Sequence, residues 1–177
     1  MNISSWAKVL TFVLLLFPYS TVVTGQTQVN DARGSERIWL DSDITHNGDY
    51  QWKMMKAGDI ADPGEKVSLS DYPTTNWLPA IVPGTVLNSL VYNQKYPEPY
   101  YGINNKIESK LIPDISETGR DFYTYWFRTD FSVPQSFKGK TVWLQLDGIN
   151  YRAEVWVNGN LLSTITVSYT HLTLPTT

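Results

Sequence analysis

The sequence predicts an all-β fold, an antiparallel β-sandwich, and three observations in its second half lead to that prediction. Residues 123–131, 141–146 and 153–157 alternate with the period of two that a half-buried strand requires. Asn158-Gly159 follows the last of these runs, and both residues tolerate the positive φ of a type I′ hairpin turn. Short runs at this spacing, without the strand–helix–strand rhythm of a parallel sheet, are typical of antiparallel sandwiches.

The alternation also assigns side chains to the faces of each strand. In residues 123–131 one face is expected to carry Tyr123, Tyr125, Phe127, Thr129 and Phe131, and the other Trp126, Arg128 and Asp130. The apolar faces of the next two strands are expected to carry Val142, Leu144 and Leu146, then Ala153, Val155 and Val157. Residues 161–165 are predicted to return from the hairpin turn, and the earlier turns are expected at Lys138-Gly139-Lys140 and Asp147-Gly148.

The first half of the chain is predicted to be less regular. Residues 38–40 are expected to begin the first strand, and Asn47-Gly48 marks a turn before a weakly alternating strand at residues 50–53. Residues 61–71 contain a Pro-Gly pair and are predicted to form a loop with one short strand at residues 66–69.

Residues 73–83 are expected to be extended, because each proline in this segment biases the residue before it away from the helical region. A helical turn is predicted to follow at residues 86–92, with Thr85 as its N-cap. The apolar residues of this helix recur at helical spacing and form one stripe.

Residues 1–25 are predicted to be a secretory signal peptide. Lys8 supplies the positive charge, residues 9–17 supply the apolar core, and cleavage is expected before Gln26. An uncleaved membrane anchor is the alternative, but the apolar run is well short of the ~20 residues that a spanning helix needs. The processed chain is therefore expected in the periplasm or outside the cell, without attachment to the membrane.

Residues 167–177 are predicted to be foreign to the native protein. Their sequence, VSYTHLTLPTT, matches the translation of a sequencing-library adapter, so we interpret them as read-through. A genuine terminal strand is the alternative, since Thr and Leu also suit a strand. The genomic reading frame at this point decides between the two.

The domain proper is expected at residues 38–166, as a sandwich truncated on its C-terminal side. Residues 26–37 are polar and without pattern, and we predict that they form a leader. A jelly roll closes when its last strands pair with earlier ones, so truncation is expected to leave an unpaired sheet edge near residues 155–162.

The composition argues against several classes of function. The chain has no cysteine, and His46 is its only histidine outside the tail, so no zinc or other transition-metal site is expected. Lys8 is the only charged residue in the two trimmed ends, so 13 of the 14 basic and all 17 acidic residues remain, a net charge of about −4. That charge argues against nucleic acid and anionic membranes as partners. No cofactor is predicted.

Three blocks, in this order, resemble the N-terminal domain of glycoside hydrolase family 2. They are WLPAIVPGTVL at 77–87, YWFRTDF at 125–131 and VWVNG at 155–159. Three further segments are similar to the branch that holds β-mannosidases, exo-β-glucosaminidases and mannosylglycoprotein endo-β-mannosidases. These are PEPYYGIN at 97–104, GRDFYTYWF at 119–127 and GINYRA at 148–153.

The resemblance implies a jelly roll of the galactose-binding type, in agreement with the strand pattern. It also implies a parent enzyme that hydrolyses β-mannosides with retention, through two Glu residues in a catalytic barrel downstream of this domain. Retention needs two carboxyl groups about 5–5.5 Å apart. We therefore expect no catalytic residue in this chain, which alone should be inactive. Its expected partners are a carbohydrate and the downstream barrel.

By the same resemblance, the loop at residues 99–104 lies near the mouth of the barrel. Asn104 is a candidate substrate-binding residue, because its amide offers a donor and an acceptor to a sugar hydroxyl. Tyr100 and Tyr101 are candidates for stacking on a sugar ring. The alternative is an ordinary loop Asn, with tyrosines that pack on the neighbouring domain.

Other readings stay open at this point. Within the family, the parent is alternatively an exo-β-glucosaminidase or a β-galactosidase. Outside it, the chain is alternatively a free-standing carbohydrate-binding module, since the 7 Trp and 11 Tyr suit sugar stacking as well as a sandwich core. The motifs leave open the sugar and its linkage, the exo or endo mode, and the oligomeric state.

Overall fold

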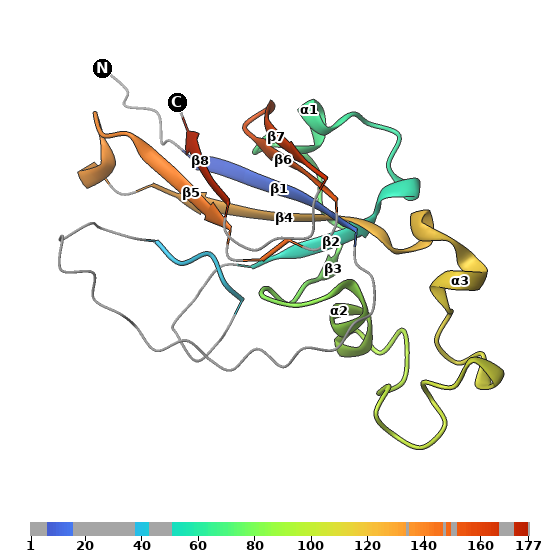
Figure 1. Cartoon of the computed structure of the whole chain (residues 1–177). Coiled ribbons are helices and arrows are strands. Elements are labelled where there is room, and N and C mark those ends of the chain that lie inside the picture. The colour runs from blue at the N-terminus through green and yellow to red at the C-terminus, as the bar shows by residue number, and fades with distance from the viewer. Residues whose placement is uncertain are drawn as a thin grey trace.

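The strands of the protein form two antiparallel sheets (Figure 1). The computed structural model describes residues 7–15, 38–42, 51–133, 135–146, 148–149, 152–166 and 172–176. The larger sheet has the order β3-β2-β4-β1-β6-β7, and the smaller pairs β5 with β8. The strands are β1 Ala7–Leu15, β2 Lys53–Lys56, β3 Leu78–Pro79, β4 Thr124–Ser132, β5 Val142–Leu146, β6 Ala153–Val157, β7 Asn160–Ile165 and β8 Leu172–Thr176. The helices are short: α1 Gly64–Val67, α2 Val86–Tyr92 and α3 Ile115–Thr118, with 3₁₀ turns at Ala57–Asp59, Ile107–Ser109, Arg120–Tyr123 and Gln135–Phe137. The predicted all-β sandwich is confirmed.

One face of the larger sheet carries the main core. Tyr125 and Phe127 of β4 are buried there with Val155 and Val157 of β6. Leu144 and Leu146 of β5, in the second sheet, pack against this core. Val86 and Leu90 of α2 are also buried in this core. The predicted alternation is therefore confirmed for β6, for Tyr125 and Phe127 of β4 and for Leu144 and Leu146 of β5, whereas Tyr123 lies in the 3₁₀ turn before β4.

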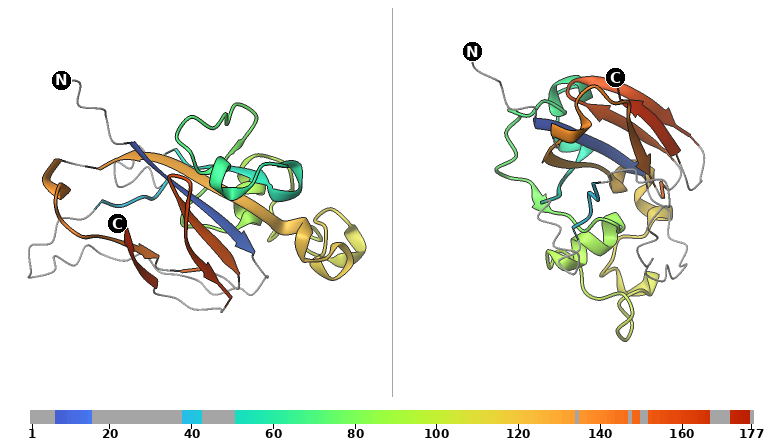
Figure 2. Two further views of the ribbon diagram at one scale, coloured as in Figure 1. Left: turned by 90° about the horizontal axis from the view of Figure 1, so that it is seen from above. Right: turned by 90° about the vertical axis from the view of Figure 1, so that its left-hand side faces the viewer.

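The opposite face of the larger sheet has a smaller core. Trp126, the neighbour of Tyr125 on β4, is buried there against Val67 of α1 and Trp77. Figures 1 and 2 show α1 and α2 on opposite sides of the sheet. The larger sheet is therefore covered on both faces.

The hairpin turn between β6 and β7 is as predicted. Asn158 and Gly159 have φ angles of 48° and 83°, the positive values that a type I′ turn needs. The Gly159 N–H donates to the hydroxyl of Ser68 at 2.9 Å, and Ser68 is fully buried just after α1. This bond ties the tip of the hairpin to the segment that covers the second core.

Helix α2 begins where the sequence predicts. The Thr85 side chain accepts a hydrogen bond from the Asn88 N–H at 2.9 Å, so it caps the first turn. Val86 and Leu90 of the predicted apolar stripe are buried in the main core. Capping and burial therefore act together to place this helix.

Thr85→Ala is expected to lower the free energy of unfolding by about 1 kcal/mol, because it removes the acceptor for an orphan helix donor. Thr85→Ser, which keeps the hydroxyl, should cost less. Urea unfolding measures both. Thr75→Ala, at an exposed threonine outside any helix or strand, is the control and should change stability by less than about 0.5 kcal/mol. Equal effects at the two positions would contradict a capping role.

The segment before α2 is held by three side chains. The Ser42 hydroxyl accepts from the Val82 N–H at 2.6 Å and donates to the Val82 carbonyl at 3.1 Å. The buried Ser89 hydroxyl accepts from the Ile81 N–H at 3.0 Å, and the Asn93 amide donates to the Pro79 carbonyl at 2.7 Å. The Val82–Pro83 peptide bond is cis. These bonds fix the backbone of the VPGTV motif between residues 38–42 and α2.

The predicted strand at residues 66–69 is wrong, because this segment begins inside helix α1. Pro63 has an extended backbone, and its carbonyl accepts from the N–H groups of Lys66 and Val67 at 2.9 and 3.0 Å. Lys66 also pairs with Asp62 one turn earlier, at 2.8 Å. A short mixed run of this kind fits a helical turn as well as a strand, and local hydrogen bonding decides between them.

Two predictions near the first strand also need correction. Residues 38–42 form no strand, although the indole N–H of Trp52 donates to the Leu40 carbonyl at 2.8 Å and Ser42 bonds to Val82. The strand predicted at residues 50–53 starts at its last residue and continues as β2. Residues 26–37, Asn47-Gly48 and Asp147 lie outside the described residues.

Both ends of the chain pair with the sandwich. Strand β1, within the predicted signal peptide, lies between β4 and β6 in the larger sheet. Strand β8, within the predicted read-through, pairs with β5. Strand pairing does not test whether a segment is later cleaved or how it is encoded. The signal peptide at residues 1–25 and the read-through at residues 167–177 therefore stay predictions. Among the described residues, no helix has the length and apolar character to cross a membrane.

In the full chain the predicted unpaired edge near residues 155–162 lies at β7, Asn160–Ile165, and not at β6. Here β6 has a neighbour on each side, β1 and β7, and β7 is the outer strand of the sheet. The physical reason is that Ala7–Leu15 supplies the neighbour that the prediction assumed to be missing.

Candidate functional site

The loop that contains Asn104 is closed by its own hydrogen bonds. The Glu98 carbonyl accepts from the Tyr101 N–H at 3.2 Å and from the Asn104 side-chain amide at 2.8 Å. The Asn104 N–H donates to the Tyr101 carbonyl at 3.1 Å, and Gly102 has the positive φ of 58° that the turn requires. Asn104 therefore holds the loop with its NH₂ group, while its amide oxygen has no partner in the part of the chain that the structure describes.

Tyr100 and Tyr101 point away from the sandwich into solvent. Their side chains are 86% and 77% exposed, so both rings are free to stack on a ligand or to pack on another domain. The structure therefore brings the three predicted site residues together on one loop.

The loop belongs to a larger apolar surface between α2 and α3. Exposed apolar side chains gather along this segment: Tyr92, Tyr100, Tyr101, Ile103, Ile107 and Leu111. Figure 1 shows the segment extending from the sheet beyond α2. At its far end the Tyr123 hydroxyl donates to the Pro113 carbonyl, and burial raises the pKa of Tyr123 to about 12. Apolar surface of this kind is typical of a contact with another domain.

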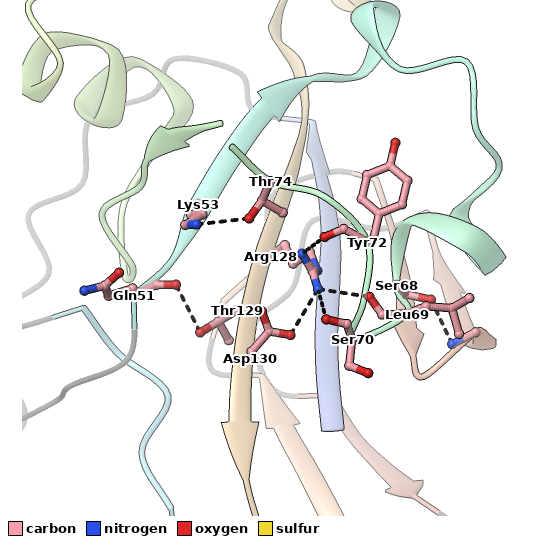
Figure 3. Close-up of polar contacts among 11 residues, drawn as sticks. Gln51, Lys53, Ser68, Leu69, Ser70, Tyr72, Thr74, Arg128, Thr129 and Asp130 are labelled. Carbon is pink, nitrogen blue, oxygen red and sulfur yellow. Dashed lines mark hydrogen bonds and ion pairs between the residues drawn. The ribbon is translucent and has the colours of Figure 1, made fainter. Parts of the chain in front are cut away.

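A second polar cluster surrounds Arg128 (Figure 3). Its guanidinium, only 2% exposed, donates to the carbonyls of Leu69 and Tyr72 at 2.9 and 3.0 Å and to Asp130 at 3.1 Å. Burial lowers the pKa of Arg128, and Asp130 opposes that shift. Arg128 therefore clamps the segment after α1 onto β4.

A polar hollow of about 220 Å³ adjoins this clamp. It is lined by Gln51, Lys53, Thr74, Arg128 and Asp130, and Lys53 donates to the Thr74 hydroxyl at 3.0 Å. Carbonyls and Asp130 already use the terminal nitrogens of Arg128, and its Nε is buried without a hydrogen-bond partner among the described residues. The arrangement is that of a structural clamp with a small solvated recess.

The partners of Arg128 include one carboxylate, that of Asp130, while the Glu154 carboxylate accepts from the Trp156 indole N–H at 3.1 Å. The backbone carbonyls that Arg128 binds lie more than fifty residues earlier in the sequence. No sequence signal marks such acceptors, because every residue carries a carbonyl.

A cleft of about 360 Å³ brings several carboxyl groups together. Asp62, Asp121 and Glu154 lie in its lining with Trp126 and Arg152. A general acid needs a raised pKa, whereas hydrogen bonds from Lys66 and Tyr72 lower the pKa of Asp62. Within the described residues no cluster of three His, Asp or Glu side chains is arranged to hold a metal ion. The cleft therefore has no feature that assigns chemistry to it.

Comparisons with known proteins agree with this geometry. A mannosylglycoprotein endo-beta-mannosidase from Lilium longiflorum is 36% identical over 115 residues, which make up 63% of this chain and 12% of that protein. An exo-beta-D-glucosaminidase from Streptomyces avermitilis is 30% identical over 113 residues, 63% of this chain and 11% of that protein. The crystal structure of the Amycolatopsis orientalis exo-chitosanase matches 71% of this chain and 14% of its own, with a TM-score of 0.58 and 26% identity.

The chain thus spans 11% to 14% of the length of these proteins. The profile of the domain described as "Glycosyl hydrolase 2 galactose-binding domain-like" matches residues 27–175, most of the chain and both sheets apart from β1. Sequence motifs, sandwich fold and profile lead to one assignment. The chain belongs to the glycosyl hydrolase 2 galactose-binding domain-like family.

Proposed function

We propose that the chain is the N-terminal, non-catalytic domain of a secreted glycoside hydrolase that cleaves β-mannosides. The observation that carries this proposal is the 36% identity to the lily endo-beta-mannosidase, together with the PEPYYGIN and GRDFYTYWF segments. An exo-β-glucosaminidase parent is the second candidate, because the Streptomyces relative is an exo-beta-D-glucosaminidase by name and the Amycolatopsis structure is that of an exo-chitosanase.

The reaction itself belongs to a part of the parent enzyme outside this chain. Two Glu carboxyls about 5–5.5 Å apart would act there as nucleophile and as acid/base. The domain would support the barrel through the apolar surface between α2 and α3, where Tyr100 and Tyr101 are exposed. Asn104 would offer its free amide oxygen to a sugar hydroxyl.

Secretion is part of the same proposal. The family profile begins at residue 27, next to the cleavage site expected before Gln26. This boundary supports a signal peptide at residues 1–25. N-terminal sequencing of the secreted protein tests it, and a mature protein that still begins at Met1 would contradict it.

Substrate class is tested with the full-length parent enzyme on aryl β-mannoside, β-glucosaminide and β-galactoside. We expect the highest kcat/KM on the mannoside, and no turnover of any of the three by the 177-residue chain alone. A preference for glucosaminide would favour the second candidate. Turnover by the chain alone would overturn its non-catalytic role.

Asn104→Ala in the full-length enzyme should lower kcat/KM about five- to tenfold, as expected for loss of one sugar hydrogen bond. The matched control is Asn105→Ala at the exposed neighbouring asparagine. Asn104→Ala also removes the bond to the Glu98 carbonyl and so loosens the loop. Asn104→Asp removes the same bond but keeps an oxygen acceptor for the sugar. Comparing the kcat/KM of the two variants therefore separates the sugar contact from closure of the loop. Unchanged kinetics for Asn104→Ala would remove this residue from the site.

A free-standing carbohydrate-binding module is the alternative from another class, and the exposed rings of Tyr100 and Tyr101 favour it. Calorimetric titration of the chain with mannose, glucosamine and galactose oligosaccharides tests this reading. Millimolar or tighter binding that Tyr100→Ala abolishes would support it, whereas absence of binding would favour the enzyme-domain proposal.

A further inference from the structure

The hairpin turn between β6 and β7 contains one of the two Asn-Gly pairs of the chain, Asn158-Gly159, and the other is Asn47-Gly48. In such a pair the glycine nitrogen can attack Cγ of the asparagine side chain. A succinimide ring closes, the proton of the glycine N–H passes through water to the leaving nitrogen, and ammonia departs. Water then opens the ring to aspartate or isoaspartate, so one water is consumed for each ammonia released. Glycine permits this attack because it has no Cβ beside the nitrogen.

The conformation of the turn keeps the two reacting atoms apart. Asn158 and Gly159 have φ angles of 48° and 83°, as in a type I′ turn. An ideal turn of this type has a ψ of about 30° at its first central residue. That ψ places the Gly159 nitrogen on the opposite side of the Cα–C bond from Cβ of Asn158, whereas ring closure needs both atoms on the same side. The attack therefore requires the turn to leave its native conformation.

The attacking nitrogen is also held by a buried side chain. The Gly159 N–H donates to the Ser68 hydroxyl at 2.9 Å, the bond that Figure 3 draws at Ser68. Ser68 is fully buried, and its hydroxyl donates in turn to the Glu65 carbonyl at 3.4 Å. The reaction begins with loss of the proton from the Gly159 N–H, and a buried hydrogen bond protects an N–H from exchange with water. Ser68 therefore opposes the first step.

The tip of the hairpin packs directly on the segment that contains Ser68. A Cβ placed at Gly159 would lie 3.2 Å from Cδ2 of Leu69 and 3.4 Å from the Glu65 carbonyl oxygen. The peptide unit between Asn158 and Gly159 can rotate only when the tip lifts from this segment. Asn158 is half-buried at the surface, so water reaches the turn once the tip has lifted.

We propose that Asn158 is a latent deamidation site, which the contact of the hairpin tip with Ser68 keeps unreactive while the tip is closed. The reaction takes place in the conformation in which the tip has lifted from residues 65–69. It is one-way, because isoaspartate carries Cβ in the main chain and adds a negative charge. The lengthened turn no longer presents the Gly159 N–H to Ser68 in the native register. This site is independent of any sugar that the parent enzyme binds.

The test measures conversion of Asn158 in the full 177-residue chain. The protein is incubated at mildly alkaline pH, in buffer and in unfolding guanidinium chloride, and peptide mapping by mass spectrometry follows Asn158 with time. Asn47 is followed in the denaturant as a reference for the same pair in an unfolded chain. We expect similar rates for the two asparagines there, and a rate for Asn158 in buffer at least about tenfold lower. Equal rates for Asn158 in buffer and in denaturant would overturn the proposal.

Ser68→Ala should raise the rate at Asn158 in buffer at least about threefold, because it removes the acceptor of the Gly159 N–H. The rate in denaturant should stay the same. Ser70→Ala, at an exposed serine in the same segment, is the matched control and should leave the rate in buffer unchanged. If Ser68→Ala does not fold, Ser68→Cys replaces it, since a thiol is a weaker acceptor and should shift the rate in the same direction. An unchanged rate in the folded Ser68 variant would overturn the proposal.

Thr85→Ala separates opening of the tip from unfolding of the whole chain. It weakens the cap of α2, on the opposite side of the larger sheet from α1, and leaves the hairpin tip intact. Local opening does not depend on global stability, so this variant should leave the rate at Asn158 in buffer unchanged. Equal increases in the Thr85→Ala and Ser68→Ala proteins would assign the reaction to global unfolding and would also overturn the proposal.

Discussion

Arg128→Leu is expected to lower the free energy of unfolding by about 3 kcal/mol. The guanidinium is 2% exposed and donates to the carbonyls of Leu69 and Tyr72 and to Asp130. Leucine fills much of the volume but donates nothing, so partly buried carbonyls lose their partners. The segment that covers the second core would then be held by apolar contacts and by the bond from Gly159 to Ser68. Urea unfolding at neutral pH measures the change.

Two further variants separate the stability that comes from the hydrogen-bonding fork of Arg128 from the stability that comes from its charge. Arg128→Lys keeps a cation but lacks the planar fork, so it should cost about half as much as Arg128→Leu. Asp130→Asn should cost less than about 1 kcal/mol, because the Asp130 side chain is 53% exposed and its ion pair is solvated. If the free energy of unfolding of Arg128→Leu lies within about 1 kcal/mol of that of the unsubstituted chain, the carbonyls must be hydrogen-bonded to water in the variant.

Gly64→Ala is expected to lower the free energy of unfolding by about 2 kcal/mol, as overpacking usually does. A Cβ at Gly64 would lie 2.4 Å from Cε2 of the Trp156 ring, so the rigid indole would have to move. That movement would also break its bond to Glu154, which is 3.1 Å long. The second core would lose contacts on β6.

The matched control for this variant is Gly58→Ala, in the 3₁₀ turn that precedes α1. A Cβ there meets no atom within 4 Å, so the substitution should leave stability unchanged or raise it slightly by restricting the unfolded chain. Urea unfolding of both variants, with tryptophan fluorescence as the probe, makes the comparison. Equal changes in the free energy of unfolding for Gly64→Ala and Gly58→Ala would show that the Trp156 ring can move away from the added Cβ without loss of stability.

The strands of the second half were predictable because their side chains alternate over long runs. Tyr125 and Trp126 are adjacent in sequence yet lie in different cores, as a period of two requires. The Asn158-Gly159 turn and the Thr85 cap were predictable for a related reason. Each depends on the chemistry of one or two residues and their immediate neighbours, which the sequence displays directly.

Features that depend on distant or generic groups were not predictable. The run at residues 66–69 begins inside a helix, whose first turn is closed by bonds to the Pro63 carbonyl, and the central neighbour of β6 comes from residues 7–15. The candidate site shows the same limit. Sequence similarity drew attention to Asn104, but only the structure shows that its NH₂ group is committed to the Glu98 carbonyl.

The bonds from Trp52 to Leu40 and between Ser42 and Val82 have a practical consequence for defining the domain. A shortened protein that starts at Lys53, the first residue of β2, would retain every strand of its sheets after β1, yet it would lose the buried Trp52 and would leave both backbone groups of Val82 without their bonds to Ser42. The minimal folding unit therefore reaches back at least to Leu40, into a stretch without regular secondary structure. Anyone choosing an N-terminal boundary should follow these anchors and not the strand assignment.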